Sequence, residues 1–240
     1  MNPFPLALHS QDFLNFLDGW LSALGPLPLA DVLAEPEKTA ILSIDVIQGF
    51  CTAGPLASPR VGAIVAPIVT LFQAAWARGL RQIVLIQESH EPDAVEFGAW
   101  PPHCVRGTPE AETVAAIKAL PFYEQLTKYT KNSIAPGLNI GLDGWIADHP
   151  RVDTFIVVGD CTDLCTYQLA MYMRLDANAR QLQRRVIVPV DCVDTYNRGV
   201  AVAAEQGGLP HDADLLHAVF LYHMALNGVE VAARLNHTPL

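Results

Sequence analysis

Several polar and nucleophilic side chains fall where apolar segments of the chain end. Asp45 closes one such segment, Lys131 follows another, and Cys165 stands where TFIVVGD (154 to 160) gives way to a helical pattern. A cysteine at a helix start lies beside unpaired N–H groups, whose partial positive charge favours the thiolate. A nearby lysine would lower the thiol pKa further, and an aspartate could take the proton and pass it to a leaving group. The three residues predict an activated nucleophile. The alternative is that Cys165 is a small buried apolar side chain.

These residues require a scaffold that gathers several strand ends at one edge. From residue 40 onward, short apolar runs alternate with longer helical patterns, which is typical of βαβ units and a parallel sheet. We predict strands at 40–45, 82–87, 124–130, 154–160, 185–191 and 229–234, and helices at 61–78, 109–119, 141–148, 163–181 and 212–227. The pattern predicts an α/β fold: a three-layer α/β/α, Rossmann-like domain with a six-stranded, mostly parallel sheet. Ligands are expected beyond the carboxyl ends of its strands.

The N-terminal part of the chain has a different pattern. Residues 11–24 carry apolar side chains at helical spacing, and a Pro-rich stretch that we expect to be irregular follows. We therefore divide the chain into residues 1–38, an N-terminal helix and connector, and residues 39–240, the main domain. The helix either packs on the flank of the sheet or forms a subunit contact.

Composition excludes several classes of protein. The 240 residues are 51% apolar with a formal net charge of -10, which excludes intrinsic disorder and argues against a nucleic-acid partner. No run approaches the roughly 18 consecutive apolar residues of a membrane span, and the N-terminus lacks the features of a signal peptide. We expect a cytoplasmic protein whose five cysteines stay reduced.

Two motifs resemble those of the isochorismatase-like cysteine hydrolases. IDVIQGF (44 to 50) is similar to the family pattern D-x-x-x-x-F, and GDCTDLCT (159 to 166) is similar to G-x-x-T-x-x-C. The resemblance implies that Asp45 is the catalytic carboxylate and that Cys165 forms a thioester with the substrate. It also implies an oxyanion hole made by the N–H groups of Cys165 and Cys161, beside a cis peptide between Asp160 and Cys161.

The lysine of the set has two candidates. The family places a lysine four residues before a small residue, and Lys131 stands four before Ala135. Lys128 is the competitor. We favour Lys131, because it lies just past the predicted strand, whereas Lys128 lies within it.

A further resemblance points to the nicotinamidases. WPPHCVRGTPEAE (100 to 112) and QESHEPDAVEF (87 to 97) are similar to nicotinamidase segments, the second to a loop that binds a divalent metal and through it the pyridine nitrogen. The matching ligand positions are Glu88, His90 and Glu96, so the family's Asp, His, His has become Glu, His, Glu. Oxygen-rich ligation favours a harder cation than zinc. Alternatively, the metal has been lost and a Glu–His hydrogen bond orients the substrate.

Three more residues match nicotinamidase positions. Phe50 and Trp100 match residues that line the ring-binding pocket, although either could be plain core. His103 also matches, with a loop histidine bonded to backbone as the alternative.

These resemblances imply a cysteine-dependent amidohydrolase. We expect it to cleave nicotinamide to nicotinate and ammonia, or a related amide or ureide, as a homo-oligomer with no organic cofactor. The alternatives are an isochorismatase-type hydrolase that acts without the cysteine, and a non-catalytic relative that binds a small ligand or a partner protein.

Overall fold

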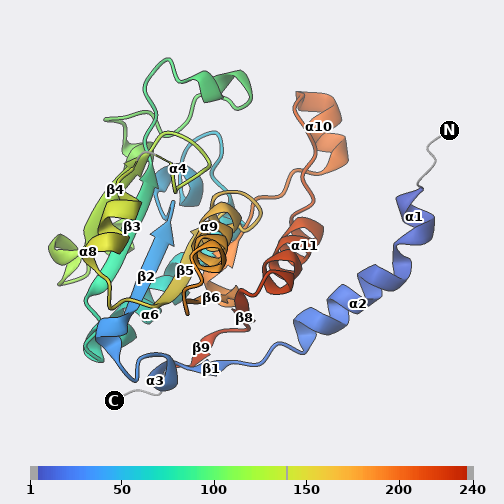
Figure 1. The fold of residues 1–240 in the computed structure, drawn as a ribbon. Helices are drawn as coiled ribbons and strands as arrows, with labels where there is room; N and C mark the ends of the chain where they lie inside the picture. Colours follow the sequence, from blue (N-terminus) through green and yellow to red (C-terminus); the bar gives the residue numbers. More distant parts are fainter. Residues whose placement is uncertain (1–4, 139, 237–240) are drawn as a thin grey trace.

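A parallel sheet forms the centre of the computed structural model, which describes residues 5–138 and 140–236 (Figure 1). Within these residues the sheet has seven strands in the order β4-β3-β2-β5-β6-β8, with β7 paired to β5. The bounds are β2 Thr39–Ile44, β3 Gln82–Glu88, β4 Thr127–Lys131, β5 Thr154–Asp160, β6 Arg185–Pro189, β7 Val193–Asp194 and β8 Glu230–Ala232. Every pair in the sheet is parallel. The predicted α/β fold is confirmed, and the two-residue β7 is the strand that the sequence did not reveal.

Helices cover both faces of this sheet (Figure 1). The main ones are α5 Pro59–Ala63, α6 Val65–Ala77, α7 Ala115–Lys118, α8 Leu142–Asp148, α9 Cys165–Ala179 and α11 Ala213–Leu226. One apolar core lies between the sheet and α5, α6 and α7, and a second lies between the sheet and α8, α9 and α11. The strands are apolar runs because each central strand is buried on both faces, as all six residues of β2 are.

Strand register brings the ends of β2, β3, β4 and β5 together. Ile44 pairs with Gly159, and Glu88 pairs with Lys131. At Gly159 the backbone has a φ of +118°, and a Cβ there would lie 1.9 Å from the carbonyl oxygen of Ile44. Glycine therefore permits the close approach of β5 to β2 immediately before the site.

The edge strand β4 begins later than predicted. The sequence suggested residues 124–130, whereas the strand spans Thr127–Lys131 and a short 3-10 turn occupies Tyr123–Gln125. Exposed and half-buried residues alternate along the strand until Lys131, which is buried. An edge strand has less cover, which explains its weak apolar pattern.

The N-terminal region forms an arm beside the domain (Figure 1). It contains α1 Leu6–His9, α2 Gln11–Ser22, β1 Leu27–Pro28 and α3 Leu29–Val32. Phe13, Phe16 and Trp20 surround Tyr222 of α11 with ring centroids 5.4 to 5.5 Å away. The arm thus packs on the domain's flank, while Phe13 and Phe16 remain 44% and 49% exposed.

The Pro-rich connector is more ordered than expected. Its β1 pairs in parallel with β9, Leu235–Asn236, which joins the two ends of the described chain. In α3, Leu29 and Val32 are buried in the core on the α6 side of the sheet. Apolar residues between prolines therefore contribute to the core here.

One apolar segment meets the length of a membrane span. Pro59–Ala77, which comprises α5 and α6, is long and apolar enough to cross a membrane by length and composition. Its residues Ile68, Leu71 and Phe72 are buried in the core against the sheet. This burial matches a core helix of an α/β domain.

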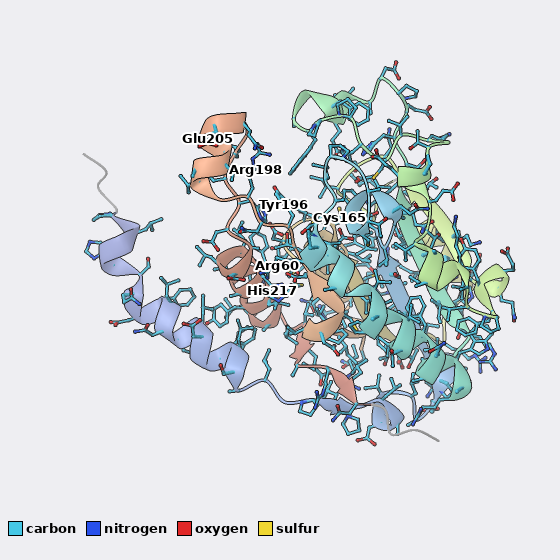
Figure 2. The ribbon with its side chains drawn as sticks, turned by 180° about the vertical axis from the view of Figure 1, so that it is seen from behind. Arg60, Cys165, Tyr196, Arg198, Glu205 and His217 are labelled. Atoms are coloured by element: carbon cyan, nitrogen blue, oxygen red, sulfur yellow. The ribbon has the colours of Figure 1, made fainter. Side chains whose placement is uncertain are left out.

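A helix that the sequence did not suggest stands out from the body. The segment α10, Val200–Gln206, lies beyond Tyr196 and Arg198, and Figure 2 shows it projecting with Glu205. Of its described residues, Ala203 is the buried one. Its sequence consists mostly of small apolar residues, so apolar and polar side chains do not recur at helical spacing and the sequence gives no sign of a helix.

Candidate active site

Asp45 follows the central strand β2 and is 1% exposed. Its φ is +56°, a conformation that aspartate tolerates better than most residues. The Oδ1 atom accepts a 2.8 Å hydrogen bond from the N–H of Glu88, and this bond orients the carboxyl group. Burial raises the pKa of Asp45 to about 6, with the positive charge of Lys131 opposing the shift. Asp45 is therefore a carboxylate near neutral pH that can still accept a proton.

Lys131, the last residue of β4, is the buried cation of the site. Its Nζ lies 2.8 Å from Asp45 Oδ2, 2.8 Å from Glu88 Oε1 and 3.5 Å from Cys165 Sγ. Although burial opposes it, the charge of Asp45 holds the pKa of Lys131 well above its ordinary value. Lys128 instead lies at the surface, over the ring of Tyr123 and 3.9 Å from Glu124. The structure thus brings Lys131, and not Lys128, to Asp45 and Cys165.

Cys165 is the first residue of α9 and is buried. The sequence led us to expect a lowered thiol pKa. The structure gives the opposite direction, because burial raises the pKa of Cys165 well above its ordinary value, an effect that the positive charge of Lys131 opposes and the negative charges of Asp45 and Glu88 reinforce. The resting side chain is therefore a thiol, and its sulfur lies 3.5 Å from Lys131 Nζ. Attack by the sulfur requires that this proton leave first.

A cavity opens onto these groups. Its lining contains the predicted residues Asp45, Phe50, Glu88, Glu96, Trp100, Asp160, Cys161 and Cys165, joined by His103 and by Leu56, Ile134, Leu164 and Tyr196. Phe50 is 8% exposed, and Trp100 contacts Tyr196 edge-on with ring centroids 6.3 Å apart. Cavities with aromatic walls and a few polar groups are typical of small-molecule sites.

The three predicted metal ligands come together, and a fourth residue joins them. Ligand atoms of Glu88, His90, Glu96 and His103 lie within 4.8 Å of one another. His103 comes from the loop before α7, and its Nε2 lies 3.3 Å from Glu88 Oε2. The set therefore has two nitrogen and two oxygen ligands, which weakens the expected preference for a hard cation.

The surroundings of the two histidines fit a divalent metal ion. His90 donates its Nδ1–H to Asn132 Oδ1 at 2.7 Å, and His103 donates its Nδ1–H to the carbonyl of Pro101 at 2.8 Å. These bonds leave the Nε2 lone pairs free to ligate, which is the arrangement found around metal-bound histidines. His90 Nε2 is buried and has no hydrogen-bond partner among the described residues. A metal ion would satisfy it.

The loop between β5 and α9 carries the remaining predicted residues. The peptide bond between Asp160 and Cys161 is cis. Cys165 stands at the helix N-terminus, where backbone N–H groups lack intrahelical partners. Asp160 and Cys161 both line the cavity, so substrate atoms held beside Cys165 also contact this loop.

A buried hydrogen-bond network stabilises the loop between β5 and α9. Asp163 accepts a 2.6 Å hydrogen bond from the Thr195 hydroxyl, and its other oxygen lies 2.7 Å from His211 Nε2. His211 Nδ1 donates to the carbonyl of Tyr196 at 2.8 Å, and the two rings stack with centroids 3.9 Å apart. Tyr196, labelled near Cys165 in Figure 2, is thereby held as a wall of the cavity.

Arg60 and His217 fix the elements below this network (Figure 2). Arg60 forms ion pairs with Asp194 at 3.0 Å and Asp214 at 2.7 Å, which join α5, β7 and α11. His217 Nδ1 lies 2.8 Å from the Thr162 hydroxyl, and burial lowers its pKa. Neither Arg60 nor His217 lines the cavity.

Sequence reasoning missed the Asp163, Tyr196 and His211 group. These residues lie up to 48 positions apart in the chain, and no periodic pattern connects them. Asp163 falls inside the cysteine motif, and that position was the one available signal.

Comparison with known proteins identifies the class. A model of the isochorismatase domain matches residues 39–208, so the chain belongs to the isochorismatase family. Nicotinamidase 1 of Arabidopsis thaliana is 29% identical over 227 residues, which cover 85% of this chain and 89% of that protein. This similarity places the chain in the nicotinamidase-like branch.

Solved structures agree on the fold. The pyrazinamidase of Pyrococcus horikoshii in complex with zinc has a TM-score of 0.65 at 20% identity and covers 81% of this chain and 98% of that one. The N-carbamoylsarcosine amidase of Thermoplasma acidophilum has a TM-score of 0.60 at 22% identity and covers 81% of this chain and 95% of that one.

Proposed function

We propose that the protein hydrolyses the amide bond of a small carboxamide through a thioester on Cys165. Its place in the nicotinamidase-like branch makes it a hydrolase of amide carbon–nitrogen bonds. The observation that supports a cysteine mechanism is the convergence of Cys165 Sγ and the Asp45 carboxylate, which both line one cavity, on the buried Lys131 Nζ.

The first half of the reaction transfers the acyl group. As Cys165 Sγ attacks the amide carbonyl carbon, its proton passes to Asp45, whose pKa of about 6 suits it to accept and return a proton near neutral pH. The N–H groups of Cys161 and Cys165 would hold the oxyanion. Asp45 then protonates the amide nitrogen, the carbon–nitrogen bond breaks, and ammonia leaves a thioester behind.

The second half releases the acid. Asp45 takes a proton from water, the resulting hydroxide attacks the thioester, and the carbon–sulfur bond breaks. The sulfur recovers its proton from Asp45. The sum is amide plus water giving carboxylic acid plus ammonia. Lys131 keeps its proton throughout and stabilises the Asp45 carboxylate and the negative charge that develops on sulfur.

Glu88, His90, Glu96 and His103 would hold a divalent ion at the cavity wall. Such an ion would supply a positive centre able to bind a lone pair of the substrate. The other hypothesis is that this cluster binds no metal, and that Glu88 and the histidines form hydrogen bonds with one another instead.

Nicotinamide is the first substrate to test. Phe50 and Trp100 both line the cavity and provide the aromatic walls that a pyridine ring requires, and the Arabidopsis relative is named a nicotinamidase. Related amides or ureides are the next candidates.

The test is ammonia release from nicotinamide, pyrazinamide and a ureide by the wild-type protein, Cys165→Ala and Cys192→Ala. Cys192 is also buried, but it does not line the cavity, so its variant is the matched control. We expect turnover by the wild type and the control and its loss in Cys165→Ala. Intact mass spectrometry of the quenched wild type should show the acyl adduct. Turnover that survives in Cys165→Ala would refute the cysteine mechanism.

A further inference from the structure

Asp160 is a buried residue at the cavity wall, and one of its two carboxyl oxygens has no hydrogen-bond partner in the part of the chain that the structure describes. It is the last residue of β5 and is 1% exposed. Its Oδ1 atom has no hydrogen-bond partner among the described residues, and its Oδ2 receives one weak contact, from Cys161 Sγ at 3.8 Å. Buried polar atoms are almost always satisfied, so an unpartnered one requires an explanation.

The side chain faces the substrate side of the loop. Alternate residues of β5, Ile156 and Val158, are buried in the same core cluster as Phe50, so Asp160 continues along that face of the sheet. Asp160 and Phe50 both line the cavity, together with Asp45 and Cys165. A molecule held against Cys165 therefore lies within the same enclosure as the Asp160 carboxyl.

The protein offers this carboxyl no better partner. The charged groups that act on it are Asp45, Lys131 and Glu88, and Lys131 already contacts both of those acids. Burial and the negative charge of Asp45 raise the pKa of Asp160 well above its ordinary value. In either protonation state, the carboxyl group keeps an oxygen that can accept a hydrogen bond from a donor inside the cavity.

We propose that Asp160 is a specificity-determining residue, whose Oδ1 accepts a hydrogen bond from a second N–H or O–H group of the substrate. The preferred substrate is then an uncharged small amide that carries a donor, such as an amino, hydroxyl or ureido group, besides the carboxamide that is cleaved. This inference rests on the proposed amide hydrolysis.

The charge of the cavity sets a further limit on the substrate. The described lining residues include the carboxyl groups of Asp45, Glu88, Glu96 and Asp160 and no arginine or lysine side chain. A carboxylate on the substrate would meet the acceptor oxygen of Asp160, so the second group is a neutral donor.

The test compares matched amides that differ by one donor. The value of kcat/KM is measured for nicotinamide and for its 2-amino and 6-amino derivatives, with the wild type, Asp160→Leu, Asp160→Asn and Asp148→Leu. Asp148 is an exposed residue of α8, so Asp148→Leu controls for the loss of a carboxylate elsewhere.

We expect the wild type to prefer at least one amino derivative by about tenfold or more, because a site built to bond a polar group discriminates against analogues that lack it. Asp160→Leu should abolish this preference, measured as the ratio of kcat/KM for the amino derivative to that for nicotinamide, and Asp148→Leu should keep it. Asp160→Asn, which retains an acceptor oxygen, should keep part of the preference.

A binding measurement covers the case in which Asp160→Leu does not fold. Calorimetry with Cys165→Ala and with Cys165→Ala/Asp160→Asn gives the affinity ratio of the same amides without turnover, and we expect the ratio to fall in the double variant. Nicotinamide hydrolysis combined with an unchanged preference in the Asp160 variants would overturn the role of Asp160 and leave the proposed function intact. Failure of the wild type to hydrolyse any amide would overturn both.

Discussion

Lys131 and Glu88 occupy paired positions at the ends of β4 and β3, and their side chains form a buried ion pair of 2.8 Å. The pair joins the proposed nucleophile region to the four-residue ligand cluster, because Lys131 also contacts Asp45 and Cys165, and Glu88 also lies beside His90 and His103. A change on one side is therefore expected to alter the other.

Lys131→Met should abolish most activity and destabilise the fold. Without the ammonium group, Asp45 and Glu88 would be two buried carboxylates with no cation between them. Breaking a buried pair costs about 3–5 kcal/mol, and loss of the electrostatic stabilisation by the positive charge should lower kcat/KM by about 10²–10³-fold. Kinetics and urea unfolding measure the two effects.

The matched control is Lys128→Met, three residues away on the same strand and at the surface. It should change both quantities little. An equal loss in the two variants would mean that the strand, and not the buried ammonium, is what matters.

Activity should fall on the acid side of about pH 6. The pKa of Asp45 is raised by burial to about 6, and the proposed mechanism requires its ionised form to accept the thiol proton. Activity is therefore present above that pH and declines as Asp45 becomes protonated below it. The pH profile of kcat/KM reports this group in the free enzyme. A profile that stays flat down to pH 4 would show that Asp45 is not the base.

Alkylation of Cys165 by iodoacetamide should accelerate with pH through the alkaline range. Burial raises the thiol pKa, so the reactive thiolate is scarce at neutral pH and increases as pH rises. The rate is followed by mass mapping of the labelled peptide. Full reactivity already at pH 6 would indicate a resting thiolate and contradict this picture.

Metal content should depend on the histidines that keep a free Nε2. We expect elemental analysis to find about one divalent ion per chain, and His90→Ala and His103→Ala to lower that content. Chelation should lower the unfolding temperature, because an ion that binds the folded state stabilises it. His149→Ala is the control, since His149 bonds to the carbonyl of Trp145 on α8, away from the cluster. Metal-free protein with unchanged activity would favour the hypothesis that the metal has been lost.

His211→Ala should weaken substrate binding more than catalysis. His211 connects Asp163 to Tyr196, so its removal frees a cavity wall while Asp45, Lys131 and Cys165 stay in place. We expect KM to rise by about tenfold with kcat changed by about threefold or less, the pattern of lost uniform binding. The exposed His223, which bonds to Tyr167, provides the control variant His223→Ala. A fall in kcat at unchanged KM would assign His211 a different role.

The central strands were predictable because burial on both faces leaves a simple apolar signature, as β2 and β5 show. Helix α10 and the connector helix α3 have no such signature. Their positions depend on contacts with residues that are distant in the sequence. In α3, for example, two residues that stand between prolines, Leu29 and Val32, pack in the core.

The site was predictable where one residue ends one strand. Asp45 and Lys131 follow that pattern, Cys165 begins the helix after β5, and the family motifs identified all three. His103 and Tyr196 come from loops, where position depends on tertiary contacts that no spacing encodes. The direction of the Cys165 pKa shift also escaped prediction, since the helix N-terminus and the lysine were visible in the sequence but the depth of burial and the nearby charge of Glu88 were not.

The pairing of β1 with β9 determines how far the chain can be shortened. The family model ends at residue 208, yet the apolar layers also draw on Leu29 and Leu235 on one face and on Leu221 and Met224 on the other. A protein trimmed to residues 39–208 would lose these residues and expose to water the apolar core residues that they cover. We expect it to aggregate during expression. Recombinant work on this enzyme should therefore retain the segments on both sides of the recognised domain.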